Sequence, residues 1–417
     1  MLPSSNSSGE ISFVDALFTS TSAICVTGLI VKDTPNDFTL VGQIIILFLL
    51  QLGGLGIMTF STLILFAAGR KISITDRVLV QEGYHPGISW DFRSLIKNIF
   101  IFTFIIEFSG FVLLFLRFRE DSDLPEALYS ALFHSVSSFC NAGFSVYSDS
   151  LMSYRDDILV NITVISLIIL GGLGFLVIRE VLRASRGLIR GAKIRLSLHS
   201  KLVLSLTVVL IIGSFILFLL LEGNGAMRNF TLKEKILASL FQVVTPRTAG
   251  FNTMDLTALG PASVLLLIML MFIGASPGST GGGVKTSTFG VVLAFVRSRI
   301  AARESVHLFF RNIPQENIVR AFTLIALSMN LIFFSSLIIF VNQPQLVMKD
   351  VFFEVFSGFG TVGLSLGITP HLSSLSKTMI IITMYAGRIG PLTLLYAFSR
   401  RRAVGKFEYV EERVMIG

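Results

Sequence analysis

Four short segments share one pattern, in which a glycine follows a short apolar segment and precedes a long one. They are Val26-Thr27-Gly28-Leu29, Asn141-Ala142-Gly143-Phe144, Thr248-Ala249-Gly250-Phe251 and Thr361-Val362-Gly363-Leu364. Their glycines lie 107 to 115 residues apart, which indicates an internal repeat. Four such loops around one axis can present rings of backbone carbonyls that replace the hydration shell of a potassium ion. We therefore predict a filter that binds K+ at the first three residues of each segment.

Glycine suits these positions because it adopts positive φ without a Cβ clash, so the backbone can aim carbonyls at an axis. Non-helical backbone at membrane depth survives only inside protein or beside water, since each unpaired polar group costs several kcal/mol in lipid. The alternative is four ordinary helix–loop turns. Recurrence in register, each time after a short apolar segment, favours the filter.

Acidic residues follow three of the four glycines at an offset of five or six residues, namely Asp33, Asp149 and Asp255. The fourth segment has Ile368 and Thr369 at these offsets. A ring of carboxylates at an outer mouth concentrates cations. Acids of ordinary solvated loops explain the sequence equally well.

A second glycine motif, Leu-Gly-Gly-Leu-Gly, occupies 52–56 and recurs at 170–174. Small residues of this kind usually serve close helix packing. The fourth repeat has Arg388 in place of the second glycine, and an arginine within a span costs at least about 2.5 kcal/mol and normally faces a cavity. The third repeat has a run rich in Gly, Ser and Pro at 274–288, which should break its span. We predict a gate below the filter, formed by Gly274, Gly278, Gly281, Gly282, Gly283, Lys285 and Arg388.

The chain shows no sign of being an enzyme. Residues 278–286 resemble a phosphate-binding loop, but that motif requires Gly directly before Lys, and Val284 intervenes. The five histidines and the two cysteines, Cys25 and Cys140, have no metal-ligand spacing. We expect no covalent cofactor and assign the cysteines to packing behind the loops.

Composition predicts an all-α membrane protein. Of 417 residues, 53% are hydrophobic and only 14% are charged, whereas a soluble domain has about a quarter charged. The net charge of +8 does not indicate nucleic-acid binding, because the basic residues cluster between apolar runs, where they report membrane orientation. We expect the partner to be membrane lipid and not nucleic acid.

Seven apolar runs are long enough to cross a bilayer, which takes about 20 residues: 38–69, 98–116, 158–178, 202–221, 256–283, 321–341 and 378–399. Four shorter runs directly precede the glycine segments and are predicted to be pore helices: 11–24, 125–139, 232–244 and 346–359. The first repeat has no span before its pore helix. We expect either a start codon assigned too far downstream or a natural seven-span variant. The complete design would in either case have eight spans, with the first one missing from this sequence.

Lysine and arginine gather between the repeats and near the end of the chain, at 70–97, 179–201, 297–320 and 400–406. These segments should face the cytoplasm, so we predict a multi-pass protein of the plasma (inner) membrane with a cytoplasmic C-terminus. The expected repeats are 1–75, which lacks its first span, 76–190, 191–305 with the broken second span and an intramembrane loop, and 306–417 with a cytosolic tail.

These motifs, with Phe-Val-Asp-Ala-Leu-Phe at 13–18 and Pro-Arg-Thr-Ala-Gly-Phe-Asn at 246–252, resemble the Trk/Ktr/HKT superfamily of potassium transporters. Within it, the chain looks most like the membrane subunit of the bacterial Ktr potassium uptake system. The resemblance implies four pseudo-symmetric helix–pore helix–helix repeats around one central pore. It also implies a homodimer on a cytosolic ring of separate nucleotide-binding regulatory subunits.

In this superfamily a serine in the first loop accompanies sodium preference, so Gly28 favours potassium as the transported ion. Na+ remains a candidate coupling or activating ion. Two other transport functions are a sodium-permeable channel of the same superfamily and a solute transporter with discontinuous helices. The solute transporter predicts two related halves and a pair of broken spans, whereas the sequence shows four related units and one clear break.

Overall fold

The computed structural model describes residues 5–7, 11–56, 92–191, 195–391 and 393. Most of the basic segment 70–97, the end of the expected span 378–399 and the C-terminal tail lie outside these residues. The regular elements of the described part are helices, apart from one short antiparallel hairpin, β1 (His307–Leu308) with β2 (Arg311–Asn312).

Four short helices end just before the four glycine segments: α1 (Phe13–Ile24), α7 (Leu124–Phe139), α11 (Leu232–Val244) and α15 (Met348–Gly360). They match the predicted pore-helix runs to within two residues. Local signals fix their starts. The Ser12 side chain accepts a hydrogen bond from the Asp15 N–H, and Thr231 with Glu234 forms a capping box. The N-terminus of α7 instead has Pro125 in its first turn.

Three predicted spans are confirmed as helices long and apolar enough to cross a membrane: α6 (Phe92–Phe118), α10 (Leu198–Glu222) and α14 (Gln315–Asn342). Shorter helices occupy three further predicted spans: α3 (Leu40–Leu55), α12 (Pro261–Phe272) and α16 (Ser374–Ile389). Other elements are α2 (Thr34–Asp37), α13 (Thr286–Ile300) and two single-turn 3-10 helices, η2 (Met152–Tyr154) and η3 (Thr369–His371).

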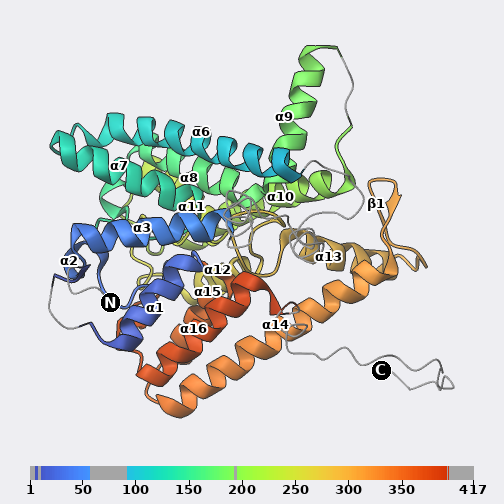
Figure 1. The fold of residues 1–417 in the computed structure, drawn as a ribbon. Helices are drawn as coiled ribbons and strands as arrows, with labels where there is room; N and C mark the ends of the chain where they lie inside the picture. The colour runs from blue at the N-terminus through green and yellow to red at the C-terminus, as the bar shows by residue number, and fades with distance from the viewer. Residues whose placement is uncertain (1–4, 8–10, 57–91, 192–194, 392, 394–417) are drawn as a thin grey trace.

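The predicted span 158–178 contains a sharp bend that the sequence analysis did not predict. It consists of α8 (Ile158–Leu173) and α9 (Phe175–Ile189), which meet at an angle of 103°. Gly174 has φ +89° at the junction, and the Phe175 N–H donates to the carbonyl of Gly278 instead of continuing the α8 ladder. In Figure 1, α9 accordingly points away from the bundle.

The helices pack as four groups that contact one another in sequence (Figure 1). In three groups a long outer helix covers a pore helix and a second apolar helix: α6 with α7 and α8, α10 with α11 and α12, and α14 with α15 and α16. In the first group α1 packs on α3. Each second helix also contacts the pore helix of the next group, through α3–α7, α8–α11, α12–α15 and α16–α1. The contacts thus close into a ring.

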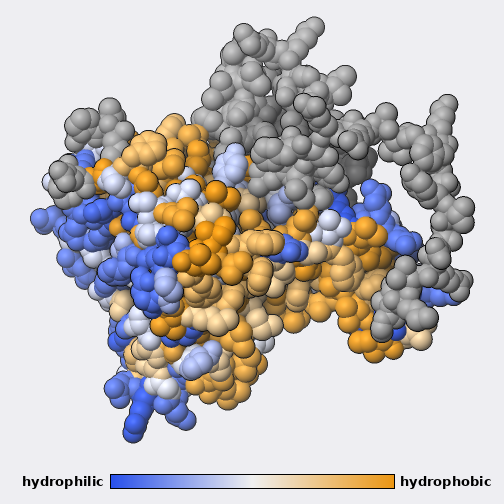
Figure 2. All heavy atoms as spheres, turned by 90° about the horizontal axis from the view of Figure 1, so that it is seen from below, coloured by the Kyte–Doolittle hydropathy of each residue, from blue (hydrophilic) through white to orange (hydrophobic). Residues whose placement is uncertain are grey.

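The outer helices expose large apolar side chains, as helices in contact with lipid do. Phe104 on α6 is 69% exposed, Leu220 on α10 is 75% exposed and Phe333 on α14 is 58% exposed. Figure 2 shows apolar residues over much of one face, with hydrophilic residues gathered toward one side.

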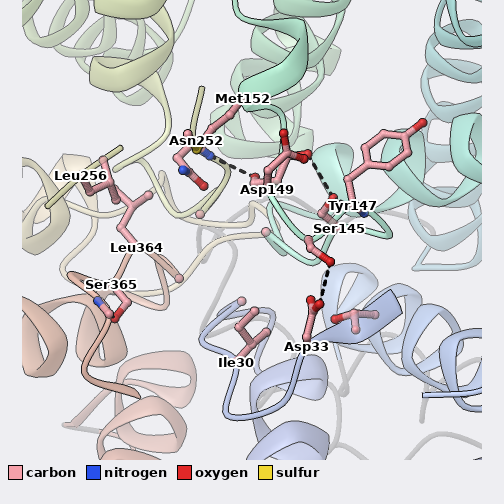
Figure 3. Close-up of a pocket in the computed structure, with 18 of the residues that line it drawn as sticks. Ile30, Asp33, Ser145, Tyr147, Asp149, Met152, Asn252, Leu256, Leu364 and Ser365 are labelled. Atoms are coloured by element: carbon pink, nitrogen blue, oxygen red, sulfur yellow. Dashed lines mark hydrogen bonds between the residues drawn. The ribbon is translucent and has the colours of Figure 1, made fainter. Parts of the chain in front are cut away.

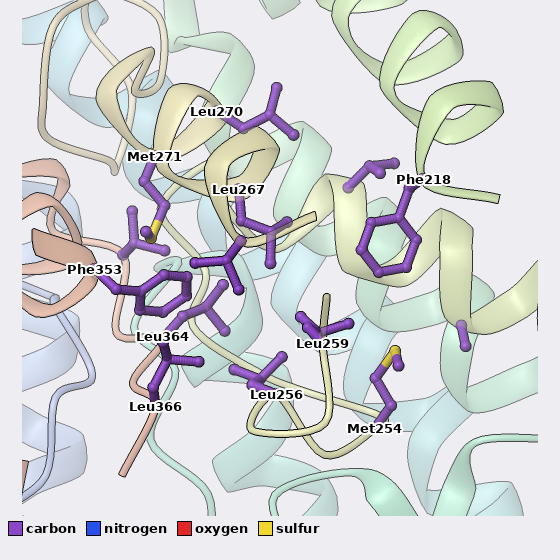
Figure 4. Close-up of a cluster of buried hydrophobic side chains, with 14 of the residues drawn as sticks. Phe218, Met254, Leu256, Leu259, Leu267, Leu270, Met271, Phe353, Leu364 and Leu366 are labelled. Carbon is purple, nitrogen blue, oxygen red and sulfur yellow. The ribbon is translucent and has the colours of Figure 1, made fainter. Parts of the chain in front are cut away.

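Apolar packing also holds the fourth glycine segment in place. Leu364 and Leu366 enter a buried cluster with Leu267 and Met271 of α12 and Phe353 of α15 (Figure 4). Fully burying one such side chain contributes about 1.5–3 kcal/mol. The residues after Gly363 are therefore fixed between two helix groups.

Candidate functional site

The four glycine segments, called loops 1 to 4 in chain order, meet in a closed ring. A Cβ atom added to Gly28 would lie 2.4 Å from the carbonyl oxygen of Ala142 in loop 2. The other three glycines show the same contact between an added Cβ and a carbonyl oxygen of the next loop. The distances are 2.7 Å from Gly143 to Ala249, 2.4 Å from Gly250 to Val362 and 2.3 Å from Gly363 back to Thr27 in loop 1. Each blocking carbonyl belongs to the residue just before the next glycine. No larger residue fits at these glycines unless the neighbouring backbone moves.

The loops also share one unusual backbone conformation. The four glycines have φ between +69° and +95°. The residue two positions earlier is left-handed in every loop, with φ between +50° and +75°, at Val26, Asn141, Thr248 and Thr361. Positive φ is uncommon outside glycine. Its recurrence at the same position shows that the surrounding structure imposes one loop shape four times.

Hydroxyl groups at the C-terminal ends of the pore helices hold three of the loops. These residues are not among the predicted site residues. Ser22 Oγ donates to the Leu29 carbonyl at 2.7 Å and Ser137 Oγ donates to the Phe144 carbonyl at 2.7 Å. Thr245 Oγ1 makes the same contact with the carbonyl after Gly250, at 2.6 Å. In loop 4, Ser357 Oγ instead accepts from the Gly363 N–H at 3.1 Å. The signal was available, because a serine lies six residues before three of the four glycines.

We expect Ser137→Ala to raise the cation concentration that gives half-maximal uptake about fivefold. Loss of one buried hydrogen bond costs about 1 kcal/mol net and frees the carbonyl that follows Gly143. Concentration-dependent uptake in a transport-deficient host measures the effect. Ser109→Ala is the matched control, since Ser109 on α6 bonds only the carbonyl of Ile106 within its own helix. An unchanged value for Ser137→Ala would show that this hydroxyl does not position the loop.

A cavity of about 280 Å³ opens above the ring (Figure 3). Its lining includes all four loop glycines and the three predicted mouth acids, Asp33, Asp149 and Asp255. Ser148 Oγ donates to Asp33 at 2.6 Å, and the Thr257 N–H donates to Asp255 at 2.9 Å. Within the described residues none of the three acids forms a salt bridge. The cavity is therefore lined both by the ring glycines and by three carboxylates that no described cation neutralises.

The predicted gate loop lies directly against loops 3 and 4. Helix α12 ends at Phe272, and the chain from 273 to 285 is not helical. A Cβ added to Gly281 would lie 2.1 Å from Thr248 Oγ1. The Gly282 N–H donates to Thr361 Oγ1 at 3.0 Å. These threonines lie two residues before Gly250 and Gly363, so the gate loop contacts the base of the ring.

Backbone hydrogen bonds tie the gate loop to the glycine motifs of two neighbouring helices. On α8, the Ser276 N–H donates to Gly172 at 3.0 Å and the Thr280 N–H donates to Gly171 at 3.2 Å. On α16, the Gly283 N–H donates to Gly387 at 3.1 Å. Two further gate glycines have different reasons: Gly278 has φ +68°, and a Cβ on Gly274 would lie 2.2 Å from the Gly282 carbonyl.

Two cationic side chains bind carbonyls of this region. Arg388 donates from one terminal nitrogen to the Thr280 carbonyl and from the other to the Gly53 carbonyl of α3. Lys285 Nζ donates to the Gly281 carbonyl at 2.7 Å. Neither cation forms a salt bridge in the part of the chain that the structure describes. Arg388 thus links the gate loop to the first helix group and keeps its charge beneath the ring.

The Gly-Gly motifs have a packing role as well. A Cβ added to Gly53 or Gly171 would lie about 2 Å from a carbonyl at the end of the preceding pore helix, Ile24 or Phe139. Gly387 meets Phe359 in the same way. Cys140 also packs here, because its Sγ would lie 2.4 Å from a Cβ on Gly54. These glycines bring the helices below the ring close together.

A family model described as TrkH, cation transport protein, matches residues 1–408. The chain belongs to the TrkH family. It is 39% identical to the Ktr system potassium uptake protein B of Bacillus subtilis, over 96% of this chain and 88% of that protein. It is 38% identical to the potassium/sodium uptake protein NtpJ of Enterococcus hirae, over 100% and 92% of the two chains. The family resemblance predicted from the motifs is therefore confirmed.

The fold has a solved counterpart. The crystal structure of the potassium transporter TrkH from Vibrio parahaemolyticus matches with a TM-score of 0.73 and 20% identity, over 94% of this chain and 79% of that one. Family membership and the exposed apolar helices identify the chain as a multi-pass membrane protein. The family is one of cation transporters and not of enzymes.

Proposed function

We propose that this TrkH-family protein takes up potassium across the plasma membrane through a filter of backbone carbonyls. The observation that carries the proposal is the closed contact of the four glycines beneath a cavity lined by three acids. A ring of peptide oxygens replaces the water around a potassium ion without using charged side chains. The names of the two relatives, a potassium uptake protein and a potassium/sodium uptake protein, support potassium as the ion.

The filter oxygens belong to the three residues that end at each loop glycine. The positive φ shared by the same two positions of all four loops supports this assignment, since similar loops supply similar oxygens at each level. The four pseudo-symmetric repeats then have the bounds expected from sequence, with one loop each. Asp33, Asp149 and Asp255 attract cations to the entrance.

The gate consists of residues 274–288, of which 286–288 begin α13 and the rest form the gate loop, and of Arg388. A flexible backbone segment against the base of the ring blocks the path, and a fixed positive charge repels a cation that leaves the filter. Contact of Gly281 and Gly282 with the threonines of loops 3 and 4 supports this role. A shift of the gate loop alters the base of the filter directly.

Regulation comes from a separate cytosolic ring of nucleotide-binding subunits, on which the chain sits as a homodimer. The support is the Ktr system named for the relative from Bacillus subtilis and the basic segments between the repeats. One of these segments, α9, leaves the bundle with Arg183 and Arg186 exposed. The basic segments and the C-terminus lie on the cytoplasmic side. There the basic segments contact the regulatory subunits and anionic lipid headgroups.

Uptake by purified protein in liposomes tests the function. We expect K+ to enter at least tenfold faster than Na+, because a carbonyl filter without charged ligands favours the larger ion and position 28 of the first loop is glycine instead of serine. Equal rates would favour the alternative, a sodium-permeable channel. The name of the relative from Enterococcus hirae, which includes sodium, supports this alternative. The same assay with and without a sodium gradient shows whether Na+ couples to transport. Uptake of neither ion would contradict the proposal.

A further inference from the structure

Glu354 is a fully buried acid that the filter and the gate do not use. It lies on α15, nine residues before Gly363. Ser365 Oγ donates to one carboxylate oxygen at 2.7 Å, and Thr369 Oγ1 donates to the other. Both donors belong to the chain that leaves loop 4. No salt bridge to Glu354 occurs among the described residues.

His134 occupies the corresponding place behind loop 2. It lies on α7, nine residues before Gly143, and is also fully buried. Its Nε2 lies 2.9 Å from Ser145 Oγ, and its Nδ1 lies 2.8 Å from the Ser130 carbonyl. Ser145, like Ser365, is the second residue after its glycine and lines the cavity.

The two serines share a further contact. Ser145 Oγ accepts from the Tyr147 N–H at 2.9 Å, and Ser365 Oγ accepts from the Gly367 N–H at 3.0 Å. Loops 2 and 4 are therefore supported in the same way: a buried side chain on the pore helix holds a serine that caps the outgoing turn. Because each loop contacts the next in chain order, these two loops lie opposite each other in the ring.

Loops 1 and 3 lack this support. The residues nine before their glycines are Thr19 and Phe241, and the residues two after are Ile30 and Asn252. Each of these loops does carry an acid in front, Asp33 or Asp255. Loop 2 has both devices, with His134 behind and Asp149 in front.

Loop 4 is the only one of the four without an acid at the mouth positions, where it has Ile368 and Thr369. Thr369 is one of the two residues bound by Glu354. We compare two positions in each repeat: the mouth position five or six residues after the loop glycine and the position nine residues before it. Each repeat has one carboxylate at these positions, at the mouth for loops 1 to 3 and on the pore helix for loop 4. We propose that Glu354 is the fourth carboxylate of the outer mouth and sets its cation affinity from behind loop 4. The proposal rests on the proposed cation filter.

The hydrogen-bond directions show how the charge reaches the cavity. Ser365 lines the cavity and directs its hydrogen at Glu354, while its oxygen accepts from the Gly367 N–H and lies 3.0 Å from Thr369 Oγ1. A carboxylate shielded from water acts over a longer range than a solvated one. Glu354 therefore adds negative potential at the mouth while it fixes the outgoing turn of loop 4.

The test compares two variants. Glu354→Gln keeps the shape of the side chain and removes its charge, so we expect the half-saturating K+ concentration to rise about tenfold while the maximal rate stays within about twofold. Adding Ile368→Asp to this variant places an acid five residues after Gly363, as in loops 1 and 3. We expect the double variant to return to within about threefold of the wild type. Glu222→Gln is the matched control, because Glu222 is a buried acid whose carboxylate, among the described residues, accepts from the N–H groups of Ala226 and Gly260 outside the ring.

A second readout does not depend on transport. Bound K+ stabilises the folded protein, so the melting temperature rises with K+ concentration. We expect the midpoint of this rise to shift about tenfold upward in Glu354→Gln and back in the double variant. An unshifted midpoint, or failure of Ile368→Asp to restore it, would overturn the role of Glu354. Wild-type protein that binds K+ in this assay without transporting it would count against the uptake function alone.

Discussion

Replacement of Gly143 by alanine should raise the K+ concentration that gives half-maximal uptake by more than about tenfold. The new Cβ would lie 2.7 Å from the Ala249 carbonyl and 2.9 Å from the Gly250 Cα, so the neighbouring loop must move. The positive φ of Gly143 adds about 1–2 kcal/mol for a non-glycine residue. Each 1.4 kcal/mol corresponds to a factor of ten in affinity. Growth of a transport-deficient host over a K+ series, with uptake by purified protein, measures the effect.

Two control variants separate the causes of this loss. Gly367→Ala introduces the same backbone strain just beyond loop 4, since Gly367 has φ +92° and no atom within 4 Å of an added Cβ. Gly213→Ala on α10 introduces neither strain nor contact. We expect a small loss for Gly367→Ala and none for Gly213→Ala. A loss at Gly143 no larger than at Gly367 would mean that contact between the loops does not determine ion affinity.

Replacement of Arg388 by alanine should increase K+ flux at least about tenfold when the regulatory subunits are absent. The variant removes both carbonyl contacts that link Thr280 to Gly53 across the region below the ring. It also removes a positive charge, and a unit charge roughly 8 Å from an ion contributes about 2 kcal/mol at an effective dielectric constant of 20. Flux into liposomes at fixed K+ concentration measures the change.

Arg388→Lys distinguishes charge from linkage. Lysine keeps the charge but cannot bind two carbonyls with a planar fork. We expect an intermediate flux for this variant, and for a variant that lacks Gly281, Gly282 and Gly283 we expect a flux as high as that of Arg388→Ala. If Arg388→Ala lowered flux or left it unchanged, the arginine would not be part of a gate.

Helix ends near the loops could be predicted from the sequence because their causes are local. Ser12, Thr231 and the glycine at the end of each loop lie within a few residues of the boundaries that they set. The bend within the run 158–178 could not be predicted, because hydropathy carries no direction. Its bend needs Gly174 together with the Gly278 carbonyl, more than a hundred residues away.

The support of the candidate site depends on contacts between residues far apart in the chain. Arg388 could be singled out by its cost within a span, but its partners Gly53 and Thr280 lie 335 and 108 residues away. Glu354 and His134 were passed over because one acid or histidine on an apolar helix is usually a packed side chain. Two observations distinguish Glu354 and His134 from ordinary packed side chains. Each lies nine residues before a loop glycine, and each contacts the serine two residues after that glycine.

Heavy potassium analogues test the central claim most directly. A structure of the protein soaked with Rb+ or Tl+ should show anomalous density inside the ring formed by Gly28, Gly143, Gly250 and Gly363, with backbone oxygens of loops 1 to 4 as the ligands. The density should fall as K+ replaces the analogue. A transport-competent protein whose ring stays empty, or whose ions bind only to side chains elsewhere, would contradict the carbonyl filter.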